Sequence, residues 1–417
     1  MSLRSHDAYR QAIGFLIPRT TTIKFGLERT EQLLEALGNP HQIVPSIHIG
    51  GTNGKGSVTA LVAAALEAAG FRVGVYTSPH LVDFRERITV GGVPISEPAV
   101  AMWTDRLRSL IEGSEATFFE ATTAMAFADM ASRGAEIAVV EVGLGGRLDS
   151  TNVVRPLVSG VTKIALDHQK YLGETLDAIA REKAGIAKPG APFVIGEQDP
   201  RIVAVLKAEA RRSVAALAPD QLADVRVMPP EYRWEGPLGL GGPHQRRNAA
   251  VAHGILMALP EPFRPSPAAI DQGFGTAFVP GRLDRRGRWL FDVAHNPDGV
   301  RALVAALEDL DPPRPIHALV SILGDKAWPE MLVHLDRVVD RGILTVAPSA
   351  AGRQWDLSWL RRWLERPDRP PAHARWRLIE DFPEALETVA AEAGTILVTG
   401  SFHTVGDVLA RLGLAPI

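Results

Sequence analysis

The segment "SIHIGGTNGKGSVTALVAAALEAAGF", residues 46–71, joins an apolar run to a glycine-rich loop and an alanine-rich stretch that stops at Gly70. We interpret it as a strand, a phosphate-binding loop and a helix, because glycines let backbone N–H groups approach phosphate oxygens at a helix N-terminus. The usual P-loop places a magnesium-binding hydroxyl directly after its lysine. Here Gly56 follows Lys55, and the hydroxyl comes one residue later, at Ser57. The alternative is a strand-to-helix turn with a solvated lysine, but the flanking strand and helix favour a nucleotide site.

The composition is that of an ordinary soluble protein. The chain has 417 residues, which suggests two or three domains, with 46% apolar and 22% charged residues and a net charge of −3. This balance does not predict nucleic-acid or membrane-surface binding. The absence of cysteine excludes disulfides, thiolate zinc sites and a cysteine nucleophile. We find no secretory signal and no apolar run near the ~20 residues of a membrane span, so we expect a cytoplasmic protein.

Strand-like runs alternate with helical patterns along most of the chain, which predicts an α/β fold with helix-covered, mostly parallel sheets. We expect a P-loop NTPase-like domain over 1–279, with helices on both faces of its sheet, and a smaller Rossmann-like α/β domain over 280–417. Residues 226–247 contain Pro and Gly and suit loops or a small antiparallel appendage. The candidate strands are residues 46–50, 72–78, 136–142, 157–164, 192–196, 289–294, 317–323, 343–348 and 395–400.

Polar clusters repeatedly follow these strands. Ligands of open α/β sheets bind outside the carboxyl ends of the strands, so these clusters mark a common site edge. The clusters are "GGTNGKGS", "TSPH", "EVGLGGRLDSTN", "ALDH", "DVAHNP", "LGDK" and "TGSFHT".

Several strand ends carry oxygen or nitrogen ligands for a metal. Glu141 ends a strongly apolar strand, where a carboxylate is costly unless it is paired or metal-bound. Asp167 and His168 end a second strand, and Ser78 ends a third. Each residue alone also suits a solvent-facing strand end. Together with a phosphate loop they predict a magnesium site.

Lys183 lies in "TLDAIAREKAGI", which we interpret as a helix. The 3.6-residue spacing places Lys183 on the apolar stripe of that helix. Burial would lower the pKa of its amine, and a neutral amine reacts with carbon dioxide to give a carbamate, which is a metal ligand. The alternative is a lysine whose stem lies along the apolar surface while its ammonium reaches water.

The C-terminal half has two further clusters. Asp292, His295 and Asn296 in "FDVAHNPDGV" stand between a strand and a helix, where helix capping by Asn296 is the alternative explanation. Ser401 and His403 in "GSFHTV" have a similar setting. Arg282 in "PGRLD" lies at the expected domain boundary, either as a phosphate ligand or as a solvated linker charge.

These motifs together resemble the folylpolyglutamate synthase/dihydrofolate synthase family of the Mur ligase superfamily. They run in the family's order over nearly the whole chain. The matching motifs are "TIKFGLER" (22–29), "GTNGKGS" (51–57), "YTSPHL" (76–81), "TFFE" (117–120), "EVGLGGRLDSTN" (141–152), "ALDH" with "LG" (165–173), "REKAGI" (181–186), "PGR" (280–282), "DVAHNP" (292–297) and "GSFHTV" (400–405).

The resemblance implies an ATP-dependent amide ligase that adds L-glutamate to dihydropteroate or to reduced folyl polyglutamates. The substrate carboxylate takes the γ-phosphoryl group of ATP to form an acyl phosphate, which the glutamate amine then attacks. The resemblance also implies Mg²⁺, with two ions, small-molecule substrates only, and a monomer.

The resemblance assigns residues to roles. The phosphate loop is Gly54, Lys55, Gly56 and Ser57, and Asn248, Arg282, Asp292 and His295 are further ATP-binding candidates. The magnesium ligands are Ser78, Glu141, His168 and carbamylated Lys183, with Ser57 as an additional candidate. Lys55, Lys183 and His295 are the catalytic candidates. The pterin-binding residues are Lys24, Phe25, Gly26, Leu27, Thr117, Phe118, Phe119, Glu120, Leu148, Asp149 and Ser150. The glutamate-binding candidates are Asp325, Lys326, Ser401 and His403.

Three other functions stay open from the residues. One is a folylpolyglutamate synthase without dihydrofolate synthase activity. A second is a Mur-type ligase for a UDP-sugar, although the segment before residue 48 leaves no room for a UDP-binding domain. The third is a nucleotide-dependent switch, although the chain has no guanine-reading N-K-x-D motif.

Overall fold

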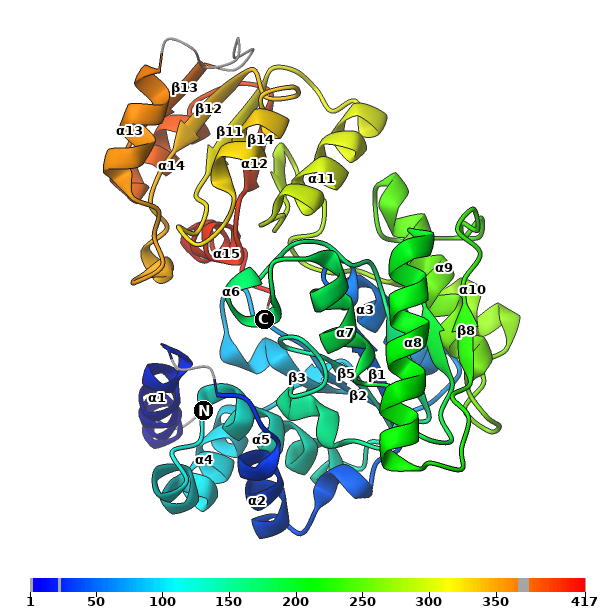
Figure 1. The fold of residues 1–417 in the computed structure, drawn as a ribbon. Helices are drawn as coiled ribbons and strands as arrows, with labels where there is room; N and C mark the ends of the chain where they lie inside the picture. Colours follow the sequence, from blue (N-terminus) through cyan, green and yellow to red (C-terminus); the bar gives the residue numbers. More distant parts are fainter. Residues whose placement is uncertain (1–2, 22–23, 367–374, 417) are drawn as a thin grey trace. The chain divides into compact units, whose positions relative to one another are not determined.

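A computed structural model describes residues 3–21, 24–366 and 375–416, and these form two compact units (Figure 1). The larger unit is built from residues 1–80, 84–239 and 247–277, and the smaller unit from 81–83, 240–246 and 278–417. The expected boundary at residue 280 lies close to the start of the last of these stretches. No sequence pattern indicated that the two short segments belong to the C-terminal unit.

The larger unit contains an eight-stranded sheet whose pairs are parallel except at the β3 and β4 edge. The strand at the centre of the site edge, β1, is buried over its whole length between β5 and β6. The strand order is β4 (Val93–Pro94), β3 (Ile88–Val90), β2 (Val73–Tyr76), β5 (Ile137–Glu141), β1 (Ser46–Gly50), β6 (Val158–Val161), β7 (Phe193–Ile195) and β8 (Val225–Val227).

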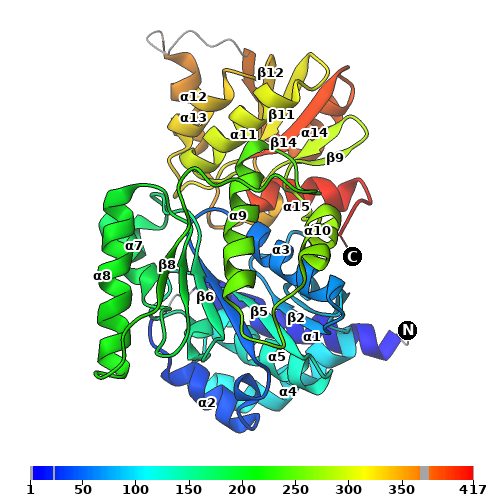
Figure 2. The ribbon, with the colours of Figure 1, turned by 90° about the vertical axis from the view of Figure 1, so that its right-hand side faces the viewer.

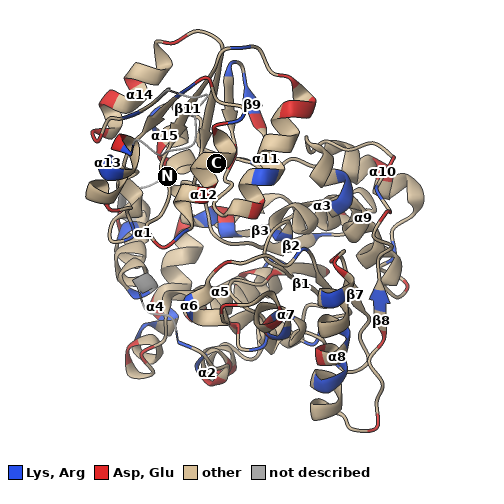
Figure 3. Ribbon diagram, turned by 45° about the horizontal axis from the view of Figure 1, so that its top comes forward, with Lys and Arg blue, Asp and Glu red and all other residues tan. Residues whose placement is uncertain are grey.

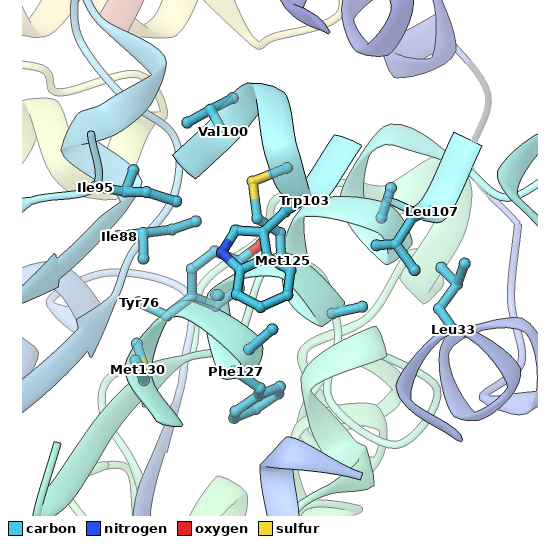
Figure 4. Close-up of a cluster of buried hydrophobic side chains, with 14 of the residues drawn as sticks. Leu33, Tyr76, Ile88, Ile95, Val100, Trp103, Leu107, Met125, Phe127 and Met130 are labelled. Atoms are coloured by element: carbon cyan, nitrogen blue, oxygen red, sulfur yellow. The ribbon is translucent and has the colours of Figure 1, made fainter. Parts of the chain in front are cut away.

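Helices cover this sheet (Figure 2). Helix α5 packs on the face that carries Ala138 and Val140, in a core that includes Tyr76 and Trp103 (Figure 4). Helix α3 contacts β1, β2 and β5 and packs against α10. The helices are α1 (Leu3–Leu16), α2 (Glu28–Ala36), α3 (Lys55–Ala68), α4 (Glu97–Gly113), α5 (Phe118–Ser132), α6 (Gln169–Leu172), α7 (Leu176–Ala184), α8 (Pro200–Leu217), α9 (Pro243–Ala258) and α10 (Pro267–Thr276), with short 3₁₀ helices that include η4 (Ser150–Val153).

The smaller unit contains a six-stranded sheet, parallel except for the β9–β10 pair. Its order is β13 (Arg375–Leu378), β12 (Arg341–Leu344), β11 (Ile316–Val320), β14 (Thr395–Thr399), β10 (Trp289–Phe291) and β9 (Asp284–Arg286). The accompanying helices are α11 (Pro297–Leu310), α12 (Trp328–Leu335), α13 (Leu357–Glu365), α14 (Phe382–Ala390) and α15 (Phe402–Arg411).

The predicted α/β architecture with two mostly parallel sheets is confirmed. Of the two alternatives for 226–247, loops are confirmed over residues 228–242, and the antiparallel appendage is wrong, because Val225–Val227 forms β8 and extends the sheet in parallel beside β7. A three-residue strand is too short to show its direction by pattern. The strands β3, β4, β9 and β13 were not predicted either, since all four are short and two of them, β9 and β13, carry charged residues.

Charge is distributed without a block of one sign. Lys and Arg are interspersed with Asp and Glu over the described chain (Figure 3). Among the described helices, none combines the length and the apolar character that crossing a bilayer requires.

Candidate active site

The phosphate loop between β1 and α3 depends on its glycines. Gly51 has φ +135°, and a Cβ there would lie 1.8 Å from Thr162 Oγ1. Gly54, with φ +92°, is the N-cap of α3, and its Cβ would lie 2.5 Å from Asn248 Oδ1. Only glycine meets both the left-handed backbone and the lack of space. The loop therefore presents backbone N–H groups and Lys55 at a helix N-terminus, which suits an anion.

Two threonines hold this loop against the segment that follows β6. The Thr52 hydroxyl accepts from Ala165 N–H at 3.1 Å and donates to Ala165 O at 3.2 Å. The Thr162 hydroxyl lies 2.8 Å from Asn53 O. The phosphate loop and residues 162–168, which include His168, therefore form one hydrogen-bonded assembly.

The metal-ligand candidates lie on the edge predicted for them. Glu141 at the end of β5 is buried and accepts from Ser78 N–H at 3.3 Å. A Cβ at Gly56 would lie 3.9 Å from Glu141 Oε2, so the usual hydroxyl position of a P-loop faces a carboxylate here. His168 precedes α6 with φ +51°. Among the described residues, no three His, Asp or Glu side chains group as a metal site, so the predicted set depends on Ser78 and on modified Lys183.

Lys183 is buried on α7, as its position on the apolar stripe predicted. Its Nζ donates to Gly51 O at 2.9 Å, so it reaches the phosphate loop. Burial, together with the nearby charge of Lys55, lowers the pKa of Lys183 to about 7. A substantial fraction of this amine is therefore neutral near pH 7, as formation of a carbamate requires.

The loop of residues 143–152 is fixed against α7. Arg147 N–H donates to Glu182 O at 2.8 Å, and the two side chains form an ion pair at 2.8 Å. Asn152 Nδ2 donates to Gly185 O at 3.2 Å. A Cβ at Gly146 would lie 2.7 Å from Glu182 O, so glycine is needed for this close approach. The 143–152 loop thus packs on the last turn of α7, which carries Lys183.

The three predicted pterin segments are linked to one another. Lys24 Nζ lies 3.0 Å from Glu115 Oε2, and Arg29 pairs with Glu120 at 2.8 Å. Glu120 and Thr117 also form the capping box that starts α5. These contacts join residues 24–29 to residues 115–120, which include the first two predicted pterin segments. Thr22 and Ile23 of the first motif lie outside the described residues.

Aromatic side chains complete these links. Phe119 stacks on Tyr76 with a centroid distance of 5.9 Å, and a Cβ at Gly143 would lie 2.3 Å from its ring. Phe25 and Tyr171 meet edge to face at 6.5 Å and are 44% and 38% exposed. The second pterin segment therefore contacts the 143–152 loop, and the first contacts α6.

Asp149 is held inside its own loop. Its carboxylate accepts from Leu144 N–H at 2.7 Å and from Thr151 N–H at 3.0 Å. Burial raises the pKa of Asp149, while these hydrogen bonds oppose that rise. The geometry suits a residue that shapes the loop around Leu148 and Ser150.

Two ATP candidates of the smaller unit, Arg282 and His295, lie near the ring of Phe402. The Arg282 guanidinium lies 5.4 Å from the centre of this ring, and the His295 ring lies 5.5 Å from it. Asp292 accepts from Leu283 N–H at 3.0 Å; burial raises the pKa of Asp292, and Arg282 opposes that rise. The His295 Nδ1 lies 2.9 Å from Val293 O, which makes Nδ1 the donor and fixes the ring.

Among the glutamate candidates, Ser401 caps a helix, whereas His403 and Asp325 lie near Arg353. Ser401 caps α15 with its hydroxyl, which accepts from Thr404 N–H at 3.1 Å. The His403 Nδ1 lies 2.9 Å from Ser349 Oγ, and burial, followed by the charge of Arg353, lowers the pKa of His403. Arg353 also binds both carboxylate oxygens of Asp325.

Lys326 follows Asp325 in the turn before α12. Its backbone N–H donates to Leu323 O at 3.1 Å. Burial alone would raise the pKa of Asp325, but the hydrogen bonds and charge of Arg353 hold it below its usual value. Asp325 and His403 therefore share Arg353 as a neighbour.

Comparison with known proteins identifies the family. Residues 49–253 match the Mur ligase middle domain, and residues 281–402 match the Mur ligase glutamate ligase domain. The dihydrofolate synthase/folylpolyglutamate synthase of Bacillus subtilis is 32% identical over 97% of this chain and 99% of its own length. The chain belongs to this family.

Solved structures of the same family share the fold. Escherichia coli FolC in complex with DHPP and ADP superposes with a TM-score of 0.81 and 30% identity, covering 98% of this chain and 97% of that chain. A bifunctional folylpolyglutamate synthase/dihydrofolate synthase with Mn, AMPPNP and L-glutamate bound gives a TM-score of 0.78 and 31% identity, covering 94% and 95%.

These comparisons confirm the predicted family, and with it the predicted class of enzyme, an ATP-dependent ligase. The individual residue roles stay predictions. Sequence reasoning missed Thr52 and Thr162 at the phosphate loop, and Arg353 and Phe402 in the smaller unit. Thr52 stands inside "GTNGKGS", so the motif itself was the signal; Phe402 lies in "GSFHTV" next to chosen residues. Nothing in the sequence around Arg353 marked it.

Proposed function

We propose that this enzyme joins L-glutamate to dihydropteroate and to folyl (poly)glutamates, with hydrolysis of ATP to ADP and phosphate. One observation carries the proposal. Lys183 Nζ donates to Gly51 O and the helix turn of Lys183 contacts the 143–152 loop, so a buried amine with a pKa of about 7 lies between the phosphate loop and a predicted pterin segment. The relatives that bind ADP with DHPP, or AMPPNP with L-glutamate, support this assignment.

The chemistry follows from these groups. A carboxylate oxygen of the pterin substrate bonds to the γ-phosphorus of ATP, and ADP leaves. The glutamate amine then bonds to the acyl carbon, phosphate leaves, and the amine loses a proton. Phosphoryl transfer depends on positioning and charge neutralisation. The N–H groups of the phosphate loop and Lys55 suit the phosphates, and Arg282 and His295 are proposed further ATP contacts.

Magnesium fits the residues at the strand ends. Glu141 is a buried carboxylate beside Gly56, and hard oxygen ligands are those that Mg²⁺ prefers. Ser78, Glu141, His168 and carbamylated Lys183 would hold the metal, with Ser57 as a further candidate. When bound, the metal neutralises phosphate charge. The carbamate forms when the neutral Lys183 nitrogen bonds to the carbon of carbon dioxide and releases a proton.

The alternative is a folylpolyglutamate synthase that does not accept dihydropteroate. The relatives named for both activities favour the bifunctional assignment. A role in folate biosynthesis, two magnesium ions and a monomeric state belong to the proposal as well. A cytoplasmic location, the expectation from the sequence, completes it.

A direct assay tests the proposal. Purified enzyme is incubated with ATP, Mg²⁺, L-glutamate and either dihydropteroate or a tetrahydrofolate monoglutamate. We expect ADP release and a product heavier by one glutamyl residue with both pterins. A product from the folate alone would support the alternative, and no product from either would refute the proposal.

The variant Lys55→Ala tests the phosphate loop. Removing the ammonium should lower kcat/KM at least 100-fold, which corresponds to about 2.7 kcal/mol of transition-state stabilisation. Arg211→Ala, at an exposed cation of α8, serves as the control for loss of one positive charge. Unchanged turnover in Lys55→Ala would show that this loop does not serve catalysis.

A further inference from the structure

His48 is a buried polar residue at the middle of β1 that the proposed mechanism does not use. Its side chain is fully buried, between β5 and β6 in the sheet. Its Nε2 lies 2.8 Å from Thr151 Oγ1, which is 103 residues further along the chain in η4. The contact therefore joins the strand before the phosphate loop to the end of the 143–152 loop.

The direction of this contact follows from its neighbours. The Thr151 hydroxyl has one proton and donates it to Asp149 Oδ1. Asp149 also accepts from backbone N–H groups, as a carboxylate does. The Thr151 oxygen is thus an acceptor toward His48, and Nε2 of the imidazole carries the proton. The bonds run His48 Nε2–H to Thr151 Oγ1–H to the Asp149 carboxylate.

This series of hydrogen bonds ends on the part of the loop that carries the third pterin segment. Asp149 receives the N–H of Leu144 near the start of the loop and the hydroxyl of Thr151 at its end, so it closes the loop on itself. Leu148 and Ser150 flank Asp149. The other side of the same loop packs on the turn of α7 that carries Lys183.

Packing does not explain an imidazole at this position. Within the described part of the chain, His48 Nδ1 is buried and has no hydrogen-bond partner. An apolar side chain of similar size would avoid that cost. The bond from Nε2 is therefore the feature that distinguishes histidine from a leucine or phenylalanine here.

We propose that His48 is a positioning residue, which sets the pterin-binding conformation of the 143–152 loop through Thr151 and Asp149. This inference rests on the proposed function, because it assigns the loop to pterin binding. It predicts that loss of the Nε2 donor weakens pterin binding and leaves nucleotide binding unchanged, since the phosphate loop has its own anchors at Thr52 and Thr162.

Two amide variants separate the donor from the packing. In His48→Gln the side-chain amide falls near Nε2 and reaches Thr151, whereas in His48→Asn it falls near Nδ1 and does not. Steady-state kinetics with dihydropteroate and with ATP are measured for both and for Thr151→Val and Thr151→Ser. Thermal unfolding of each variant is measured alongside.

We expect His48→Asn and Thr151→Val to raise KM for dihydropteroate by on the order of tenfold, as for one lost buried hydrogen bond. KM for ATP should stay within about twofold, which is less than the effect of one hydrogen bond. His48→Gln and Thr151→Ser should remain close to wild type, and His48→Asn combined with Thr151→Val should be no worse than either alone.

Three results would overturn the inference. Equal KM changes in His48→Asn and His48→Gln would exclude the Nε2 donor, and equal changes for ATP and dihydropteroate would indicate a general structural role. Failure of both His48 variants to fold would also assign His48 to stability alone. Lack of turnover by the wild-type enzyme would instead refute the proposed function, so the two failures are distinguishable.

Discussion

Lys183 is buried, and its Nζ donates to Gly51 O, which is a neutral carbonyl and not a carboxylate. This environment penalises the ammonium form, because nothing in direct contact repays its desolvation fully. The sequence stripe of α7 predicted the burial. The contact with Gly51 explains why the amine lies near the phosphate loop, where a carbamate would be a metal ligand.

The pKa of Lys183 predicts a specific effect of pH on stability. The pKa is about 7 in the folded protein and 10.5 as the ordinary value, so between these pH values the unfolded chain binds a proton that the folded protein lacks. The free energy of unfolding should therefore rise with pH from about 7 toward 10.5 through this group. Below a pH of about 7 the lysine is protonated in both the folded and the unfolded protein, so the full free-energy cost of burying the ammonium remains.

The variant Lys183→Met should remove this contribution. Denaturant unfolding of wild type and variant is compared at pH 7, 8 and 9 in metal-free buffer without bicarbonate, with about equal ionic strength in each. The difference in stability, wild type minus variant, should grow with pH. Lys170→Met provides a control for loss of one lysine. A constant difference would contradict the shifted pKa.

At the scale of elements, one hydroxyl, that of Thr52, makes two of the hydrogen bonds that hold the phosphate loop to the segment after β6. The Thr52 side chain satisfies both the N–H and the C=O of Ala165, and Thr52 N–H donates to Lys163 O at 2.8 Å. His168 lies three residues beyond Ala165. A change at Thr52 should therefore affect both nucleotide and metal binding, although Thr52 belongs to neither predicted set.

The variant Thr52→Val should raise KM for ATP and the Mg²⁺ concentration needed for half-maximal activity, each about fivefold or more. The methyl group keeps the volume but leaves both backbone groups of Ala165 without this partner, which costs about 1–3 kcal/mol. Thr52→Ser keeps the hydroxyl and should behave like wild type. If the two variants shift the ATP and Mg²⁺ dependences equally, the hydroxyl does not couple these segments.

Local patterns predicted the elements and the edge on which the site lies, but not the contacts between segments. Glu141 and His168 were identified because polar residues follow apolar strands, and Lys183 because it falls on a helical stripe. The bond between Thr52 and Ala165 spans 113 residues and has no local pattern. His48 was missed for the same reason, since an imidazole within an apolar strand shows neither its partner nor its tautomer.

At the scale of the whole molecule, the chain leaves and re-enters each unit more than once. Leu81–Asp83 and Leu240–Arg246 belong to the smaller unit, although both are separated from residue 278 in the sequence. Leu81 and Val82 pack against the core that contains Val405 and Val408. Leu81 and Val82 therefore complete the core of the smaller unit, although they come from the N-terminal half of the chain. We expect the stability of that unit to depend on them.

The variant Leu81→Ala tests this dependence. Removing a partly buried leucine from the core with Val405 should destabilise the smaller unit by about 1–3 kcal/mol, below the cost for a fully buried leucine. Hydrogen exchange measured by mass spectrometry should show faster exchange in peptides from β14 and α15 and unchanged exchange in β1 and β5. Val93→Ala, at an exposed residue of the larger unit, is the control. Local destabilisation appears first in the unit that loses the contact. Faster exchange confined to the larger unit would therefore contradict the assignment of Leu81 to the core of the smaller unit.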